Sequence, residues 1–234
     1  MVEIVVADTQ LLIIVAIVNR ALLTVKKIRQ QRLRPAAAVV TIGAMDTVED
    51  FTQPIRLSSS IVLLGMKHVG KTTLGQQFAT RHHLAWIDMD ELIVDRARES
   101  YNIEARNARE VYIKLGKDGF QEIETAAARY LRLYSSRNQI IATGGGIADN
   151  PAALAELAAI GTSVYLQESP DILFQRIMAG GLPPFLDARD PRGSFDELFD
   201  RRDAIYRKTA RIVLNLQGAS IPEALQLFET AIRG

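Results

Sequence analysis

One stretch of the sequence has the residue types and the spacing of a phosphate-binding loop. It matches the pattern G-x-x-x-x-G-K-[ST] and reads Gly65-Met66-Lys67-His68-Val69-Gly70-Lys71-Thr72. Glycines let consecutive backbone N–H groups turn inward around an anion, and the N-terminus of the following helix adds a positive dipole. We therefore predict that backbone amides between Met66 and Thr73 bind a nucleoside triphosphate. Lys71 would reach its β- and γ-phosphates, and the Thr72 hydroxyl would hold Mg²⁺.

Two carboxylates follow the next apolar run, in the order Asp88-Met89-Asp90. Residues i and i+2 after a strand point to the same side, toward the carboxyl edge where α/β sheets bind ligands. One carboxylate can orient the Mg²⁺ shell, and the other can accept hydrogen bonds from a substrate hydroxyl. A solvated loop pair, or a helix cap before Leu92, is the alternative interpretation.

Three consecutive glycines, Gly144, Gly145 and Gly146, follow the run Ile140-Ile141-Ala142-Thr143. Glycines at the end of a strand let a small ligand approach the backbone closely. Taken alone, the triplet is equally consistent with an ordinary loop.

In this order, the phosphate loop, D-x-D and A-T-G-G-G resemble the shikimate kinase family of small P-loop kinases, from about Ile61 to Ile232. The resemblance implies transfer of the γ-phosphoryl group of ATP to the 3-hydroxyl of shikimate, with Mg²⁺. It implies Lys71 and Asp90 as catalytic residues, Asp90 also binding the substrate hydroxyls, and Asp88 near the metal through water. The three glycines would line the substrate pocket.

Two arginines extend this resemblance. Arg202, in Arg202-Asp203-Ala204-Ile205-Tyr206, matches the R-x-x-x-Y of the family, whose arginine holds the shikimate carboxylate. A forked guanidinium suits a planar carboxylate. Arg176 falls where the family stacks an arginine on adenine.

Two other arginines of the family pattern are absent. In G-x-x-x-F-R-x-x-E, Gln121 replaces the second carboxylate-binding arginine, although Glu124, which braces that arginine, remains. The R-P-L-L of the lid reads Pro183-Pro184-Phe185-Leu186, without the arginine that contacts the transferring phosphate. A neutral amide in place of a charge-assisted pair loses about 1.5–3 kcal/mol of binding, and a lost γ-phosphate arginine costs on the order of 10³ in rate.

These departures leave alternatives open. Arg189 or Arg192, just past the lid sequence, would fill the role of the missing lid arginine. Gln121 would suit a kinase for another, less anionic hydroxylated small molecule. A third interpretation is a sensor that binds nucleotide or ligand without turnover.

The elements that must position these residues alternate between strand and helix from Ile61 onward. Short β-rich runs lie at Ile61–Leu64, Leu84–Ile87, Gln139–Thr143, Ser163–Leu166 and Arg211–Leu216. Helical patterns lie at Lys71–Arg81, Arg106–Tyr134, Ala152–Ile160, Ser169–Met178 and Pro222–Ile232. The alternation predicts an α/β fold with a doubly wound, five-stranded parallel sheet. A mobile lid is expected around Ala179–Arg192.

Residues 1–60 are predicted to form an N-terminal helical extension and linker, and residues 61–234 the kinase-like domain. A helix is expected over Thr9–Gln31. Its apolar segment Leu11–Val18 offers a surface for docking on the kinase-like domain or for self-association.

Composition limits the classes of protein that fit. The 234 residues carry 28 Lys and Arg against 27 Asp and Glu, and 48% are hydrophobic, which excludes a strongly basic nucleic-acid wrapper and general disorder. There is no cysteine, which excludes thiol nucleophiles and cysteine-based zinc sites. The longest apolar run, Leu11–Val18, is shorter than the roughly 20 residues of a membrane span. We expect a cytoplasmic protein acting on a small molecule, with no nucleic-acid partner.

Overall fold

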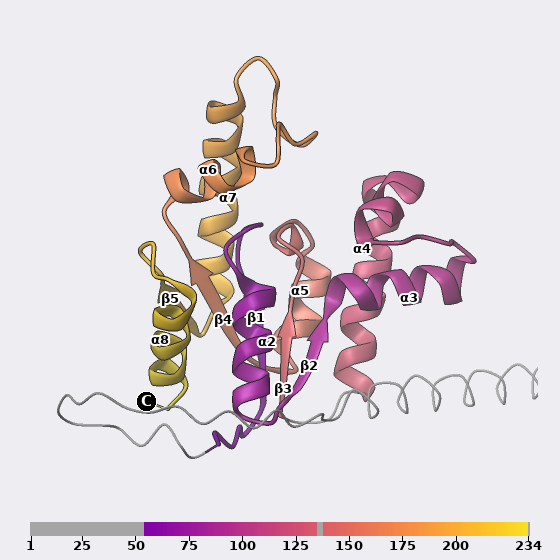
Figure 1. Cartoon of the computed structure of the whole chain (residues 1–234). Coiled ribbons are helices and arrows are strands. Elements are labelled where there is room, and N and C mark those ends of the chain that lie inside the picture. The colour runs from indigo at the N-terminus through magenta and orange to yellow at the C-terminus, as the bar shows by residue number, and fades with distance from the viewer. Residues whose placement is uncertain (1–53, 135–137, 234) are drawn as a thin grey trace, which may run out of the picture. The chain divides into compact units, whose positions relative to one another are not determined.

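The computed structural model of the chain describes residues 54–134 and 138–233 (Figure 1). The predicted N-terminal helix, most of its linker and the self-association suggested for it fall outside these residues. Within them, no helix is both long enough and apolar enough to cross a membrane.

The centre of the described part is a parallel sheet with strand order β2-β3-β1-β4-β5 (Figure 1). The strands are β1 (Ser60–Leu64), β2 (Ala85–Asp88), β3 (Gln139–Ala142), β4 (Gly161–Gln167) and β5 (Ile212–Asn215). All residues of β1 and β3 are buried, as expected for strands covered on both faces. The five-stranded parallel sheet predicted from the sequence is confirmed, and the strand ends differ by one or two residues at most.

Helices cover both faces of this sheet. They are α2 (Lys71–Arg81), α3 (Met89–Tyr101), α4 (Ala108–Tyr134), α5 (Pro151–Ala158), α6 (Pro170–Met178), α7 (Pro191–Thr209) and α8 (Ile221–Arg233), with a short 3₁₀ helix η1 (Ile147–Asp149). Helices α2 and α8 pack together on one face (Figure 1). Helices α5 and α7 contact β4 and η1 on the other face, and α4 packs on α3 and α5.

Helix α7 was not expected from the sequence, and α3 was considered only as the alternative in which a helix is capped before Leu92. Helix α3 begins directly after Asp88, whose side chain caps it. Helix α7 begins at Pro191 and is capped by Asp190, which accepts a hydrogen bond from the Gly193 N–H at 2.9 Å. The irregular segment between α6 and α7 therefore ends at Asp190, and Arg192, at the end of the expected lid, lies in the first turn of α7. That this segment is a mobile lid stays a prediction.

The pattern at Arg106–Tyr134 predicts one continuous helix, but α4 is broken at Gly116. There the backbone adopts φ 69° and ψ −172°, which is not helical. Gln121 and Glu124 therefore belong to a separate helical segment whose direction is set by this break.

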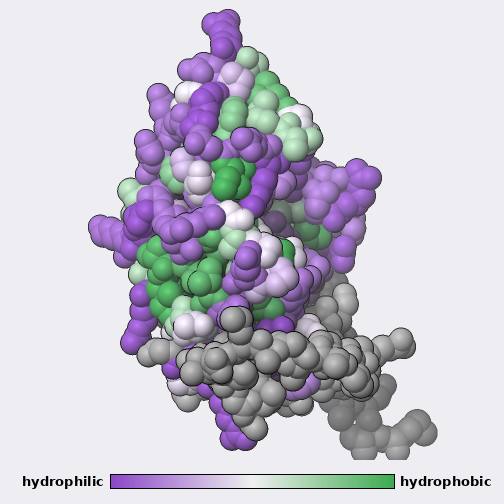
Figure 2. Space-filling view, turned by 60° about the vertical axis from the view of Figure 1, so that its left-hand side comes forward, coloured by the Kyte–Doolittle hydropathy of each residue, from purple (hydrophilic) through white to green (hydrophobic). Residues whose placement is uncertain are grey.

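Strand β5 forms one edge of the sheet, and α8 packs against it. This side comes forward in Figure 2, where hydrophobic areas lie among hydrophilic ones. Val213 of β5 and Leu227 of α8 are large apolar side chains that stay exposed. The buried core instead gathers around β1, β3 and β4, and it holds the carboxyl ends of these strands in fixed positions.

Candidate active site

The phosphate loop connects β1 to α2, as the motif requires. Gly65 has φ 145°, and a Cβ atom there would lie 2.7 Å from the carbonyl oxygen of Leu166, so only glycine fits this turn. Gly70, at φ 103°, caps α2. The backbone amides of the loop thus lie at the N-terminus of a regular helix. This is the arrangement that binds phosphates.

Lys71 is buried, with 7% of its surface exposed. Its Nζ donates hydrogen bonds to the carbonyl oxygens of Gly65 at 2.8 Å and Met66 at 2.9 Å. Burial lowers the pKa of Lys71 to about 8, against the opposing effect of the Asp90 and Asp88 carboxylates. The loop therefore holds a cation that is still mostly protonated at neutral pH.

The two oxygens of the Asp88 carboxylate have different partners, one of which matches the helix-cap interpretation from the sequence. Its Oδ1 accepts a hydrogen bond from the Asp90 N–H at 2.9 Å, which is the helix cap. Its Oδ2 lies 3.4 Å from the hydroxyl of Thr72. A hydroxyl and a carboxylate beside a phosphate loop are oxygen ligands of the kind that Mg²⁺ takes together with nucleotide phosphates, so the residues present fit this ion.

Asp90 and the glycine triplet lie together beside the phosphate loop. A Cβ atom on Gly144 would be 3.1 Å from Oδ1 of Asp90, and one on Gly145 would be 2.6 Å from the backbone nitrogen of Lys67. The residue Asp90 is exposed, but nearby protein atoms remove part of the water around its carboxylate. This desolvation, together with the charge of the neighbouring Asp88, raises the pKa of Asp90. The triplet therefore lies between the phosphate loop and Asp90, and its lack of side chains lets the two come this close.

Helix α7 brings Arg202 to the same place. The i, i+4 spacing puts Arg202 and Tyr206 on one helix face, and both donate hydrogen bonds to the carbonyl oxygen of Gly145, from NH1 at 3.1 Å and from the hydroxyl at 3.0 Å. On the same helix, Asp203 accepts a hydrogen bond from the Tyr165 hydroxyl of β4 at 2.8 Å. The R-x-x-x-Y pattern thus fastens α7 to the glycine triplet.

Asp149 lies beside Arg202 and Gln121, and the sequence patterns did not identify it as a site residue. We call this group of residues the Asp149–Arg202 corner. The carboxylate of Asp149 pairs with both Arg201 and Arg202, and its carbonyl oxygen accepts a hydrogen bond from Nε2 of Gln121 at 2.8 Å. No local pattern marks Asp149 in the sequence. Its partners come from two helices, one well before it and one well after it, so only the folded chain reveals it.

Glu124 is buried next to Gly144 of the glycine triplet. Its Oε2 accepts a hydrogen bond from Nδ2 of Asn150 at 2.9 Å, and the same amide group donates to the carbonyl oxygen of Gln121. Burial raises the pKa of Glu124 to about 7, although the Asn150 hydrogen bond acts in the opposite direction. Residue 121 is a neutral glutamine where the family pattern has an arginine. It therefore forms no ion pair with Glu124 that would offset the cost of ionising the Glu124 carboxyl.

Arg176 lies on the outer side of the phosphate loop. Its NH1 donates a hydrogen bond to the carbonyl oxygen of His68 at 3.4 Å, and its NH2 is 3.6 Å from Oε2 of the buried Glu168. The expected stacking of Arg176 on adenine stays a prediction.

The two arginines suggested for the missing lid role have other surroundings. The guanidinium of Arg192 pairs with Asp171 at 2.6 Å and with Asp196 at 2.8 Å, so it ties α6 to α7. Arg189 is exposed, and its backbone N–H donates to Asp187. Replacement of the lid arginine by Arg189 or Arg192 stays a prediction.

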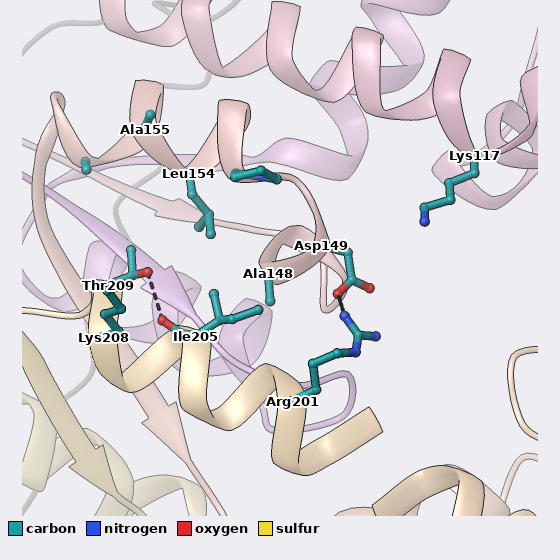
Figure 3. Close-up of a pocket in the computed structure, with 11 residues that line it drawn as sticks. Lys117, Ala148, Asp149, Leu154, Ala155, Arg201, Ile205, Lys208 and Thr209 are labelled. Carbon is teal, nitrogen blue, oxygen red and sulfur yellow. Dashed lines mark hydrogen bonds and ion pairs between the residues drawn. The ribbon is translucent and has the colours of Figure 1, made fainter. Parts of the chain in front are cut away.

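An open groove of about 710 Å³ extends from this corner between α5 and α7 (Figure 3). Basic side chains line it at Lys117, Arg201 and Lys208, and Asp149 lies at the end where Arg201 meets it. Leu154 and Ile205 form part of its apolar wall.

The site as a whole has a phosphate-binding part and a part rich in carboxylates and guanidinium groups, in contact through Gly145. The structure brings together Lys71, Thr72, Asp88, Asp90, the glycine triplet, Gln121 and Arg202, as expected from the sequence. It adds Asp149, Glu124, Arg201 and Tyr206, of which only Glu124 and the Tyr206 position were visible in a sequence pattern.

Comparisons with known proteins agree with this arrangement. A family model described as shikimate kinase matches residues 67–232. A shikimate kinase of Dechloromonas aromatica is 34% identical over 156 residues, which are 67% of this chain and 80% of that protein. A shikimate kinase of Caldanaerobacter subterraneus is 32% identical over 148 residues, 63% of this chain and 81% of that protein. The structure of shikimate kinase from Acinetobacter baumannii in complex with shikimate superposes with a TM-score of 0.62 at 26% identity, over 75% of this chain and 93% of that one. The chain belongs to the shikimate kinase family, whose members are phosphotransferases with a hydroxyl group as acceptor.

Proposed function

We propose that this protein transfers the γ-phosphoryl group of ATP to the 3-hydroxyl of shikimate. The observation that carries the proposal is the contact between the two parts of the site. Gly145 lies against the backbone of Lys67, so a nucleotide in the phosphate loop and a hydroxyl compound at Asp90 would be neighbours. Phosphoryl transfer depends mainly on such positioning and on charge stabilisation.

On the nucleotide side, the loop amides bind the phosphates and Lys71 neutralises charge that develops between the β- and γ-phosphates. Arg176, on the outer side of the loop, contacts the adenine. Thr72 and Asp88 supply oxygen ligands for Mg²⁺, Asp88 through water. When bound, the ion supplies positive charge to the phosphate oxygens.

On the acceptor side, Asp90 accepts a hydrogen bond from the reacting hydroxyl and is placed to take up its proton. The pKa of Asp90 lies above its ordinary value, which favours this role. The three glycines leave room for a ring against the backbone, and Arg202 binds the acceptor carboxylate.

A second candidate function is a kinase for a less anionic hydroxylated acceptor. Two observations favour it: Gln121 presents a neutral amide, which is already bonded to the carbonyl oxygen of Asp149, and the Asp149 carboxylate is paired with Arg202. Both reduce the positive charge available to a carboxylate.

Release of ADP in a coupled assay, with shikimate and a panel of related cyclic polyols, separates these functions. Turnover on shikimate at a rate above that of all other acceptors supports the first proposal. Turnover on another acceptor only supports the second candidate. Binding of ATP without turnover on any acceptor would point to the ligand-sensing alternative and contradict both.

Gln121→Arg, assayed in the same panel, sharpens the result. An arginine restores a charge-assisted hydrogen bond, so we expect the KM for shikimate to fall by about tenfold or more. If instead the variant creates shikimate turnover that the natural protein lacks, the natural acceptor is a different compound.

A further inference from the structure

Asp149 already binds the part of Arg202 that suits a carboxylate. Its Oδ2 accepts hydrogen bonds from NH2 of Arg202 at 2.7 Å and from Nε at 3.2 Å. NH1 of the same guanidinium donates to the carbonyl oxygen of Gly145 at 3.1 Å. A guanidinium has five N–H donors in a fixed plane, and the paired edge formed by Nε and NH2 is the one that forks onto a carboxylate. An acceptor carboxylate therefore finds this edge of Arg202 engaged.

The position of Asp149 is fixed from several sides. Its backbone N–H donates to the carbonyl oxygen of Gly146 at 2.9 Å, and its own carbonyl oxygen is held by Gln121. Only 21% of its side chain and 16% of that of Arg202 are exposed, so water screens the pair weakly.

Asp149 also stays charged. Burial acts to raise the pKa of Asp149, but the hydrogen bonds from Arg202 and Arg201 outweigh burial and hold it below its ordinary value. The carboxylate is ionised at neutral pH and competes with any other anion at Arg202.

We propose that Asp149 is a specificity-determining residue, whose carboxylate competes with the carboxylate of the acceptor for Arg202. The inference rests on the proposed function in that it takes Arg202 as the acceptor-binding arginine. Two carboxylates at one guanidinium repel each other, and Gln121 brings no second charge to compensate. A carboxylated acceptor has to separate Asp149 from Arg202, and this separation weakens its binding relative to an uncharged acceptor of the same shape.

The surroundings offer Asp149 a second place. Arg201 already pairs with it from the groove, and Lys117 lines the same groove (Figure 3). When the acceptor takes the edge of Arg202, Asp149 remains on Arg201.

The test compares the affinities of shikimate and of its uncharged methyl ester for the full chain, by calorimetric titration in the presence of ADP and Mg²⁺. Asp149→Asn keeps the shape and removes the charge; Asp149→Ala removes the competing acceptor atoms as well. In both variants we expect shikimate to bind about tenfold more tightly or better, as for a freed charge-assisted site, and the ester to change by less than about twofold. In turnover, KM for shikimate should fall relative to KM for the methyl ester.

Glu156→Gln is the matched control. Glu156 also sits between two arginines, Arg129 at 2.8 Å and Arg132 at 2.5 Å, but both of these belong to α4. Its side chain is 15% exposed, close to the 21% of Asp149. It should leave the ratio of the two affinities unchanged.

An unchanged ratio in both Asp149 variants, or weaker binding of shikimate than in the natural protein, would overturn the inference and make Asp149 a support for Arg202. Absence of shikimate turnover in the natural protein would count against the proposed function alone, because the affinity ratio decides the role of Asp149 without turnover.

Discussion

The phosphate loop and the Asp149–Arg202 corner recognise anions in different ways. In the loop, the groups expected to bind phosphate are backbone amides and one buried lysine, and all of them come from a single stretch from β1 to the start of α2. In the corner, elements far apart in the sequence meet: Gln121 of α4 bonds the carbonyl oxygen of Asp149 in η1, and Arg202 of α7 bonds its carboxylate. A backbone site tolerates changes of side chain, whereas a side-chain site changes its preference when one residue is replaced. We infer that nucleotide binding is the more robust property of this chain and acceptor choice the more variable one.

Lys71→Ala tests the phosphate part with the largest expected effect. Removing the charge at the β- and γ-phosphates should lower kcat by about 10³ or more while acceptor binding is retained. Steady-state ADP release and shikimate titration measure the two. Lys114→Ala is a matched control, because its Nζ also donates to a backbone carbonyl, that of Glu104, but outside the site. An equal loss in both variants would contradict the assigned role.

Asp90→Asn tests the acceptor part. Loss of the proton acceptor and of the charged hydrogen-bond partner should lower kcat with shikimate by about 10² or more. The affinity for ATP should change little, because the loop amides and Lys71 are untouched; titration with ATP and Mg²⁺ measures it. If ATP affinity falls as much as turnover, the division of the site into two parts is wrong.

Gly145→Ala is expected to damage both parts at once. Its Cβ atom would lie 2.6 Å from the backbone nitrogen of Lys67, so the phosphate loop has to shift. Misplacement on this scale should raise KM for ATP and for the acceptor by about tenfold or more. Gly146→Ala is the control variant. Its Cβ atom would lie 3.5 Å from NH2 of Arg202, an ordinary contact, so we expect a smaller rise in both KM values. Equal effects of the two substitutions would show that the close approach at Gly145 is unimportant.

Glu124→Gln should change the dependence of stability on pH. Since burial raises the pKa of Glu124 from 4.5 to about 7, its contribution to stability is complete below pH 4.5 and is lost as the pH rises to about 7. The variant has no such loss, so its stability relative to the natural protein should rise by up to about 3 kcal/mol between pH 4.5 and 8.

Chemical denaturation at pH 5 and pH 8 measures this difference. Glu122→Gln, an exposed change on the same helix, should show no comparable rise. A Glu124→Gln difference that is the same at both pH values would mean that Glu124 is ionised throughout.

Most of the fold follows from local sequence. The five strands are apolar runs, and the regular alternation with helices leaves few arrangements for a parallel sheet. The helices that the sequence analysis did not list, α3 and α7, follow the capping side chains of Asp88 and Asp190, and most of their residues are polar or charged. The break in α4 escaped detection because a single glycine in a helical pattern is often tolerated.

The phosphate loop, the carboxylate pair and the glycine triplet can be identified from the sequence, because each is a short pattern whose function depends on backbone geometry within a few residues. The charges that meet near Arg202 can be identified only in the folded chain. Asp149 binds Arg202 and Gln121 only after α4 and α7 have packed around η1, and the raised pKa of Glu124 comes from burial that the finished core imposes. The strength of these electrostatic interactions depends on the distance between the charges. A local sequence pattern does not predict the distance between residues of separate helices and strands.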